Sequence, residues 1–220
     1  MSTNQYSRVK YFVWTARPEQ PEFTGWCQTG RVDSEDVRAF FERVSAQWDD
    51  MRSSFYNADV IDALAERGRI TASSRVADVG TGTGFVAAGL AGRVATVTGV
   101  DNSPAMLAVA ADNLAALGAD NVRLAEGELD DLPLADDTVD VAVANMVLHH
   151  APDPAAMLAE MTRVVRPGGM IAITDEVEHP FEWMRTEQAD LWLGFTPGQV
   201  EGYFRQNRLA EFGYSSLGMQ

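Results

Sequence analysis

The feature that most constrains the fold is a change of hydrophobic period near residue 75. From there on, short apolar runs alternate with segments of helical period. Strands that alternate with helices form right-handed βαβ units, which build a mostly parallel sheet with helices on both faces. The sequence therefore predicts an α/β fold. We expect strands over 75–79, 95–101, 121–126, 139–145, 170–175 and 210–217, and helices over 85–92, 104–117, 155–165 and 197–207.

Three of the expected helices carry start signals. A capping residue stands directly before a proline at Ser103, Asp153 and Thr196. The cap side chain accepts a hydrogen bond from an unpaired N–H, and proline presets the helical φ angle. In open parallel sheets, ligands lie beyond the carboxyl ends of the strands. We therefore expect a site in the loops after residues 79, 101, 126, 145 and 175.

The first 71 residues have a different pattern. Residues 6–15 (YSRVKYFVWT) are rich in strand formers, whereas residues 17–30 carry prolines and glycines that indicate a linker or surface wrap. A helical period begins at Ser34 and places Val37, Phe40, Phe41, Val44 and Trp48 on one face. A second helix is expected over 58–67. This pattern divides the chain into an N-terminal extension (1–32), a helical lid (33–71) and a core domain (72–220).

Charge and composition exclude several kinds of partner. The 220 residues include 32 acids and 17 bases, for a net charge of −15. Such a chain repels nucleic-acid phosphates and anionic membranes, and it has neither a membrane-spanning apolar run nor a signal-peptide pattern. We expect no nucleic-acid partner and no membrane association. The single cysteine, Cys27, excludes an internal disulfide and a cysteine-cluster metal site, and indicates a reducing, cytoplasmic setting.

The loop after the first core strand has the pattern of a nucleoside site. Residues 78–85 read DVGTGTGF, and glycines there let the chain turn sharply and let a ligand approach closely. Asp101 ends the next strand about 20 residues later, where a carboxylate can accept hydrogen bonds from both ribose hydroxyls. A dinucleotide fingerprint needs a third glycine at position 85, where this chain has Phe85. Phe85 therefore argues against the rival hypothesis of a nicotinamide-dependent oxidoreductase.

With its third glycine at Gly84, the loop resembles motif I of class I S-adenosylmethionine-dependent methyltransferases. Residues 101–106 (DNSPAM), 125–133 (AEGELDDLP), 140–150 (DVAVANMVLHH) and 166–169 (RPGG) resemble further motifs of the type 11 subgroup. That subgroup includes ubiquinone and menaquinone biosynthesis enzymes and arsenite methyltransferases. The resemblance implies a Rossmann-like sheet, S-adenosyl-L-methionine as cofactor, and methyl transfer to a small-molecule acceptor by direct in-line displacement. A sensor or scaffold that binds the cofactor without transfer remains an alternative.

The resemblance also implies roles for single residues. Asp101 would bind the ribose, Met106 would lie against the adenine, and Glu128, where the family usually has aspartate, would take the adenine amino group. Helix core is the alternative for Met106 and Trp48, and a solvated loop acid is the alternative for Glu128. The expected cofactor-binding residues are Asp78, Gly80, Thr81, Gly82, Gly84, Asp101, Asn102, Met106, Gly127, Glu128, Leu129, Asn145 and Trp48.

The catalytic candidates are His149 and His150, which follow the fourth expected core strand. Adjacent side chains point in different directions, so we expect at most one to face the pocket, and a structural, loop-bonding histidine is the alternative. His179 lies on a loop with two acids, which is more often solvent-facing than metal-binding, so no metal is expected. Cys27 alone cannot hold arsenic as the several cysteines of arsenite methyltransferases do.

Two features concern the rest of the core. Aromatic residues at 181, 183, 192 and 195 are expected to form an acceptor wall, with a minor core or a homodimer interface as the alternatives. The family sheet has seven strands, of which the seventh usually returns antiparallel after a hairpin. This chain stops a few residues after the sixth expected strand. We expect residues 6–15, or a partner chain, to cover that edge, because an open apolar edge strand invites aggregation.

Overall fold

The computed structural model describes residues 10–14, 33–53, 55–209 and 211–217, and a single parallel sheet runs through them. Its order is β4-β3-β2-β5-β6-β1-β7, and every neighbouring pair is parallel. The strands are β1 (Lys10–Trp14), β2 (Arg75–Val79), β3 (Thr96–Asp101), β4 (Val122–Glu126), β5 (Val139–Asn145), β6 (Val165–Glu176) and β7 (Tyr214–Leu217). The expected Rossmann-like α/β class is confirmed.

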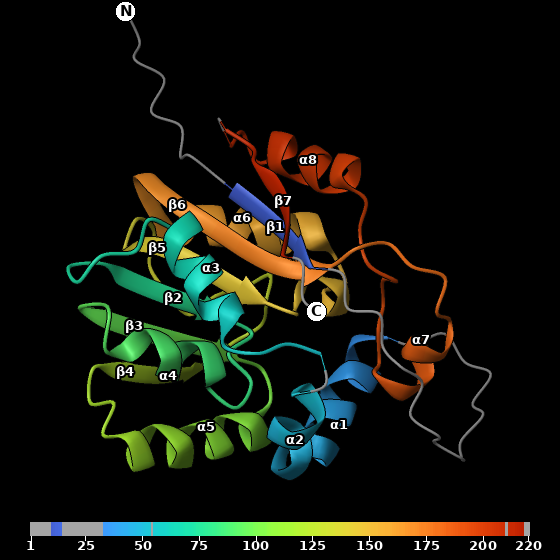
Figure 1. The fold of residues 1–220 in the computed structure, drawn as a ribbon, viewed down its shortest axis with the longest axis horizontal. Helices are drawn as coiled ribbons and strands as arrows, with labels where there is room; N and C mark the ends of the chain where they lie inside the picture. The colour runs from blue at the N-terminus through green and yellow to red at the C-terminus, as the bar shows by residue number, and fades with distance from the viewer. Residues whose placement is uncertain (1–9, 15–32, 54, 210, 218–220) are drawn as a thin grey trace, which may run out of the picture.

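Helices cover both faces of this sheet (Figure 1). α3 and α4 pack on one face around Leu64 and Leu90, whereas α6 and α8 pack on the other around Leu158 and Phe204. Both clusters include residues of the central strands, so the sheet is buried on each side. The helices are α1 (Ser34–Val44), α2 (Trp48–Arg52), α3 (Asp59–Arg67), α4 (Phe85–Ala91), α5 (Pro104–Leu117), α6 (Pro154–Val164), α7 (Trp183–Glu187) and α8 (Pro197–Gln206).

Local sequence signals, such as apolar runs and helix caps, predicted most of these elements. β2, β5 and α5 have the predicted bounds, and the Ser103, Asp153 and Thr196 side chains all accept N–H groups from the first turns of their helices. The last strand begins at Tyr214 rather than at residue 210, and it is therefore shorter than predicted. α7 was not predicted, and its five residues are too few to show a helical period.

The N-terminal strand completes the sheet. β1 lies between β6 and β7 and pairs with both, for example Phe12 with Thr174 on one side and with Ser215 on the other (Figure 1). We expected residues 6–15 or a partner chain to cover the open edge of the sheet. β1 lies within residues 6–15 and covers the edge of β6, which confirms the expectation for this strand. The strand runs parallel to its neighbours, whereas the family resemblance led us to expect an antiparallel last strand.

The other N-terminal elements lie in two places. α1 and α2 lie beyond the carboxyl ends of the strands, where a ligand is expected (Figure 1). α3, which the sequence grouped with the lid, packs on the sheet instead through Val60, Ile61 and Leu64. The predicted linker over 17–30 and Cys27 lie outside the described residues. Within the described part of the chain, no helix is long and apolar enough to cross a membrane.

Candidate functional site

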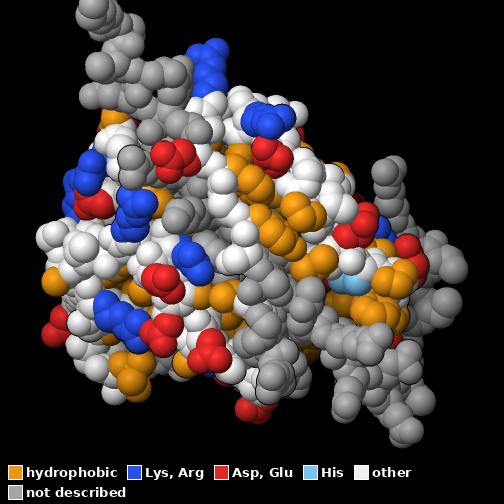
Figure 2. Space-filling model, turned by 45° about the horizontal axis from the view of Figure 1, so that its top comes forward, with side chains coloured by type: hydrophobic (Ala, Val, Ile, Leu, Met, Phe, Trp, Pro, Cys, Tyr) orange, Lys and Arg blue, Asp and Glu red, His pale blue; other side chains and the backbone are white. Residues whose placement is uncertain are grey.

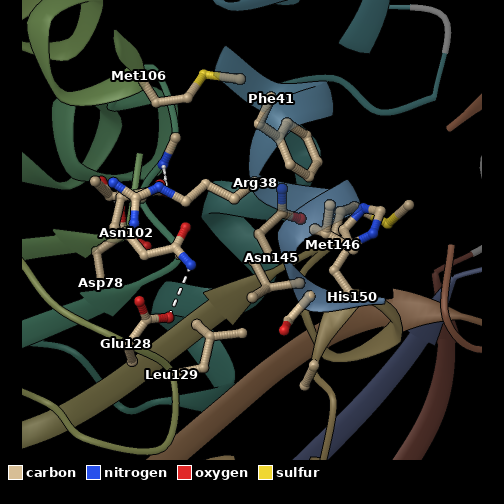
Figure 3. A pocket seen from close by; sticks show the side chains of 18 of the residues that line it. Arg38, Phe41, Asp78, Asn102, Met106, Glu128, Leu129, Asn145, Met146 and His150 are labelled. Atoms are coloured by element: carbon tan, nitrogen blue, oxygen red, sulfur yellow. Dashed lines mark hydrogen bonds between the residues drawn. The ribbon is translucent and has the colours of Figure 1, made fainter. Parts of the chain in front are cut away.

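A cavity of about 540 Å³ opens beyond the carboxyl ends of β2, β3 and β5 and beneath α1. Figure 3 shows side chains from the strand ends and from α1 directed into it. Most of the predicted site residues contribute to its lining. They are Trp48, Asp78, Gly80, Thr81, Gly82, Asp101, Asn102, Met106, Glu128, Leu129, Asn145 and His150.

The glycine loop after β2 forms the floor of this cavity. Gly80 and Gly82 both have left-handed backbones, with φ angles of 68° and 54°. A β-carbon at Gly80 would lie 2.5 Å from Val147 Cγ2, so protein atoms fill the space above Gly80. At Gly82 the nearest atom would be the Trp48 Nε1, at 3.9 Å. The space above Gly82 is therefore open to the cavity, as close approach of a ligand to the backbone requires.

Asp101 connects this loop to the end of β3. Its Oδ2 accepts from the Gly82 N–H at 2.8 Å and its Oδ1 from the Ser103 N–H at 3.0 Å. Burial raises the pKa of Asp101, and these backbone hydrogen bonds partly offset that effect. Each carboxylate oxygen has a second lone pair, so Asp101 can hold the loop and still accept from hydroxyl groups of a ligand.

Asp78 holds the start of the same loop from below. It is 1% exposed, and its carboxylate accepts from the Thr81 hydroxyl at 2.7 Å. Burial raises the pKa of Asp78 to about 6, and the nearby charge of Asp101 adds to the rise. Asp78 therefore fixes the turn of the glycine loop.

The far end of the cavity combines an amide, a carboxylate and apolar side chains. The Asn102 Nδ2 donates to the Glu128 Oε2 at 2.8 Å (Figure 3). Met106 is only 1% exposed yet lines the cavity, and Leu129 lies on the opposite side. Such a slot, apolar with polar groups at its rim, suits a flat heterocycle.

The strand end after β5 forms the third side. The Asn145 Oδ1 accepts from the Thr174 hydroxyl at 2.6 Å, which fixes the amide at the cavity wall. Met146 follows with a φ angle of 56°, and its N–H donates to the Thr174 carbonyl. This left-handed residue, rare for a non-glycine, turns the chain across the end of β5.

A polar latch holds α2 against the glycine loop. Asp49 accepts from the Thr83 hydroxyl at 2.8 Å and from the Asn113 Nδ2 of α5 at 3.1 Å. The Arg52 guanidinium lies 3.7 Å from the centre of the Phe85 ring. Partial burial opposes ionisation of Asp49, but hydrogen bonds from Arg52 and Thr83 keep its pKa below the usual value. Sequence reasoning missed Asp49, since its partners are distant in the chain.

Aromatic side chains close the end of the cavity beneath α1. Phe41 packs edge-on against Trp48, with ring centres 5.1 Å apart, and against His150 at 4.9 Å. Figure 3 shows Phe41 and His150 on the same side of the cavity as Asn145. The helical period placed Phe41 and Trp48 on one face of a helical segment, but it did not indicate that this face meets a histidine.

The two histidines have separate surroundings. His150 lines the cavity, and its Nδ1 lies 3.2 Å from the Ala189 carbonyl oxygen. A carbonyl only accepts, so Nδ1 carries the proton and Nε2 keeps its lone pair. Burial lowers the pKa of His150 well below its usual value, and the neighbouring His149 adds to the effect. His150 is thus a neutral imidazole.

His149 points away from the cavity. Its Nδ1 lies 2.8 Å from an Asp175 oxygen, and its Nε2 lies 3.7 Å from Asp190. Burial disfavours the charged form, but Asp175 and Asp190 outweigh this and raise the pKa of His149 to about 10. The structure therefore separates the two catalytic candidates, and only His150 faces the cavity.

Two other predicted residues also lie outside the lining. A β-carbon at Gly84 would lie 3.2 Å from Ala110 of α5, and one at Gly127 would lie 2.4 Å from Pro133. These glycines allow close packing within the protein rather than close approach of a ligand.

The predicted acceptor wall is wrong. Residues 181, 183, 192 and 195 do not line the cavity. Phe195 is fully buried in the α6–α8 core, the Trp192 Nε1 donates to the Ala151 carbonyl, and Phe181 stacks on His179. The sequence placed these aromatic residues near the correct sheet edge but could not show which way they face.

Comparison with known proteins agrees with this geometry. Residues 77–173 match the family model described as a methyltransferase domain. An arsenite methyltransferase of Halobacterium salinarum is 41% identical over 106 residues, which cover 47% of this chain and 27% of that protein. The 2-methyl-6-phytyl-1,4-hydroquinone methyltransferase 1 of Oryza sativa is 32% identical over 199 residues, covering 86% of this chain and 57% of that protein. The chain thus spans only part of the length of these relatives.

A solved structure shares the fold. The phosphoethanolamine N-methyltransferase 2 of Haemonchus contortus, determined with S-adenosylhomocysteine, superimposes with a TM-score of 0.68 at 21% identity. The match covers 80% of this chain and 44% of that one.

Proposed function

Residues 77–173 form a class I S-adenosylmethionine-dependent methyltransferase domain of type 11, and from this premise we propose that the protein methylates a small, neutral, planar aromatic acceptor. S-adenosylmethionine is the cofactor of this family. One observation carries the proposal: the open glycine loop, the Asp101 carboxylate and the aromatic edge of Phe41, Trp48 and His150 all meet in one cavity.

The residues present fit the cofactor. Asp101 has free lone pairs for ribose hydroxyls, and Gly82 leaves open space for a close backbone contact. Met106 and Leu129 offer apolar surface to an adenine, with Asn102 and Glu128 at its rim. When bound, the cofactor supplies a methyl group already attached to a good leaving group.

The protein's own contribution is alignment and exclusion of water. Phe41 covers the cavity on the side of Asn145, and Trp48 packs edge-on against Phe41 with its Nε1 over Gly82; together they would orient a flat acceptor. Alignment of two reactants can lower a barrier by roughly 7–11 kcal/mol. If the acceptor is a hydroxyl, the His150 Nε2 would accept the proton of that hydroxyl. Nε2 has a free lone pair because the imidazole proton is on Nδ1, which donates to the Ala189 carbonyl.

The charges of the cavity narrow the acceptor class. Its lining carries acids such as Glu35, Asp130 and Asp153, whereas Arg38 is its single lysine or arginine among the described residues. An anionic acceptor would meet repulsion there. A phenol or hydroquinone is neutral and flat, and the hydroquinone named for the Oryza sativa relative belongs to that class.

The test is a single-turnover assay with methyl-labelled S-adenosylmethionine. The panel contains phenols and hydroquinones, their carboxylated analogues, and aliphatic amines. We expect methylated product and S-adenosylhomocysteine with neutral aromatic acceptors, at rates at least tenfold above those of the carboxylates. Cofactor binding without product across the whole panel would instead favour a sensor or scaffold.

His150 is tested in the same assay. The His150→Gln variant removes the Nε2 lone pair facing the cavity, and general-base effects are about 10²–10⁴-fold. With a phenol acceptor we expect the rate to fall by at least 100-fold while the affinity for S-adenosylhomocysteine stays within twofold. An unchanged rate would remove His150 from the mechanism and leave the alignment role of Phe41 and Trp48 intact.

A further inference from the structure

A second group of polar side chains lies buried beside the cavity and outside its lining. We name it the Asp190 cluster: Asp190 itself, His149, Asp175 and Glu176 at the end of β6, and His179. His149, Asp175, Glu176 and Asp190 are buried, and the side chain of His179 is 12% exposed. The proposed methyl transfer does not use these residues.

Asp190 is the unusual member of the cluster. It is 0% exposed, and within the described part of the chain neither of its carboxylate oxygens has a hydrogen-bond partner. The His149 Nε2 is close, at 3.7 Å, but this is too long for a hydrogen bond. Buried carboxylates without partners are costly, and in proteins they are paired or coordinate metals.

The neighbours of Asp190 present metal-binding atoms toward it. The His149 Nδ1 is engaged by Asp175, which leaves Nε2 directed at Asp190. A carboxylate behind a histidine is the usual second shell of a histidine that binds a metal. On the other side, the His179 Nε2 lies 2.8 Å from the Glu176 Oε2, and donor atoms of Glu176, His179 and Asp190 all lie within 4.8 Å of one another.

The spacing suits a small ion. Donors bound at 2.0–2.2 Å around zinc are separated by about 3–3.5 Å. Here the His179 Nε2 lies 2.8 Å from the Glu176 Oε2, and the His149 Nε2 lies 3.7 Å from the Asp190 Oδ1. Asp190 is common to both sets of donors: its carboxylate lies 3.7 Å from the His149 Nε2 and within 4.8 Å of the Glu176 and His179 donor atoms, so an ion bound to Asp190 would have donors on both sides.

The charges of the Asp190 cluster also favour a bound cation. Asp175, Glu176 and Asp190 bring three carboxylates into a buried region, and no lysine or arginine in the described ranges forms an ion pair with them. Arg185 donates instead to the Leu191 carbonyl and to Glu182. A protonated His149 offsets one of these charges, and a divalent cation that displaces this proton would offset one more.

We propose that His149, Glu176, His179 and Asp190 bind one divalent first-row transition-metal ion, with Asp175 orienting His149. Two imidazoles and two carboxylates favour Zn²⁺ or Co²⁺ over Mg²⁺ and Ca²⁺, which prefer all-oxygen sites. The ion would attach the segment carrying α7 to the end of β6. That segment includes Ala189, whose carbonyl accepts from His150, so the metal would act as a positioning group behind the cavity.

The site has a route to solvent. The His179 side chain is 12% exposed, whereas His149 and His150 are buried, so the cluster reaches the surface at His179. Figure 2 shows histidine surface among acidic and hydrophobic side chains on this face of the molecule.

The experiment uses the full chain without a histidine tag and with the Cys27→Ser change, so that the thiol cannot bind the probe. EDTA-treated protein is titrated with ZnCl₂ by calorimetry and with CoCl₂ by visible absorption. We expect one ion per chain, weaker binding of MgCl₂ by at least 100-fold, and a rise in melting temperature with Zn²⁺. Absence of Zn²⁺ and Co²⁺ binding by this protein would overturn the proposal.

Variants separate the metal site from a plain ion-pair network. Asp190→Asn should weaken Zn²⁺ binding at least 100-fold and abolish the thermal shift, while the metal-free melting temperature changes little, because the Asp190 carboxylate forms no hydrogen bond that the substitution would break. The exposed Asp136→Asn change should leave Zn²⁺ binding unchanged. A large fall in the metal-free melting temperature of Asp190→Asn, with Zn²⁺ binding intact, would assign the cluster to ion pairing instead. Binding of S-adenosylhomocysteine to the same samples tests the proposed function separately.

Discussion

At the scale of single residues, Gly80 and Gly82 share a left-handed backbone but differ in what lies above them. Alanine at either position costs about 1–2 kcal/mol, because its β-carbon crowds the backbone in the left-handed conformation. At Gly80 the added methyl would also collide with Val147, whereas at Gly82 it would project toward the cavity. Gly80→Ala should therefore lower the free energy of unfolding by several kcal/mol, which urea titration measures.

Gly82→Ala should lower the affinity for the ligand more than it lowers stability. Its methyl group would occupy space that the proposed cofactor needs, so affinity for S-adenosylhomocysteine should fall at least tenfold in calorimetry. The free energy of unfolding should fall by only about 1–2 kcal/mol, the cost of a non-glycine residue in the left-handed conformation. Wild-type affinity in Gly82→Ala would contradict the placement of the ligand above this residue.

Asp78 gives a pH prediction. Its pKa in the folded protein is about 6, above its ordinary value of 3.8. The protonated form is favoured by folding, so the contribution of Asp78 to stability is full below pH 3.8 and is lost as pH rises through about 6. Asp78→Asn keeps an acceptor for the Thr81 hydroxyl but cannot ionise. The variant should gain stability relative to wild type between pH 4 and 7, by up to roughly 3 kcal/mol.

Urea unfolding of both proteins at intervals across that range checks this prediction. The difference between them isolates Asp78 from the other carboxylates, including Asp101. A difference that does not change with pH would mean that Asp78 is ionised throughout.

At the scale of elements, the Asp49 latch connects α2 to the glycine loop and to α5. Asp49→Ala removes the acceptor for both the Thr83 hydroxyl and the Asn113 amide. We expect faster proteolysis between α1 and α3 and a loss of S-adenosylhomocysteine affinity of three- to tenfold. This loss is smaller than the about 1.5–3 kcal/mol of each hydrogen bond to a charged group, because Asp49 contacts the glycine loop and not the ligand. The exposed neighbouring change Asp50→Ala is the control and should have neither effect.

The sequence predicted elements better than contacts between them. The caps at Ser103 and Asp153 and the apolar run of β5 are local signals, and their elements have the expected positions. The latch at Asp49, the unpartnered Asp190 and the Phe41–His150 contact join residues far apart in the chain. A single sequence carries no signal for such pairings, because many acids and aromatic residues have the same local pattern.

At the scale of the whole molecule, the N-terminal strand β1 connects β7 to the rest of the sheet. β7 pairs with β1, and β1 pairs with β6, so β7 is attached to the sheet through β1. Phe12→Pro removes a backbone N–H from a strand flanked on both sides, a place where proline is not tolerated. We expect a lower melting temperature and faster amide exchange throughout Tyr214–Leu217.

The matched control for this strand is Phe12→Ala, which changes the side chain but keeps the backbone N–H. Amide exchange in β7 should respond to proline far more than to alanine. Equal protection of β7 in all three proteins would show that it does not depend on pairing with β1.

The proposed function requires that the cavity over the glycine loop bind S-adenosylmethionine and that Asp101 hold it there. The most direct measurement is calorimetry of S-adenosylmethionine and S-adenosylhomocysteine binding to wild type, Asp101→Ala and the exposed control Asp112→Asn. We expect one site per chain, a loss of at least tenfold in affinity for Asp101→Ala, and wild-type affinity for Asp112→Asn. Absence of binding to the folded wild-type protein, or wild-type affinity in Asp101→Ala, would contradict this requirement.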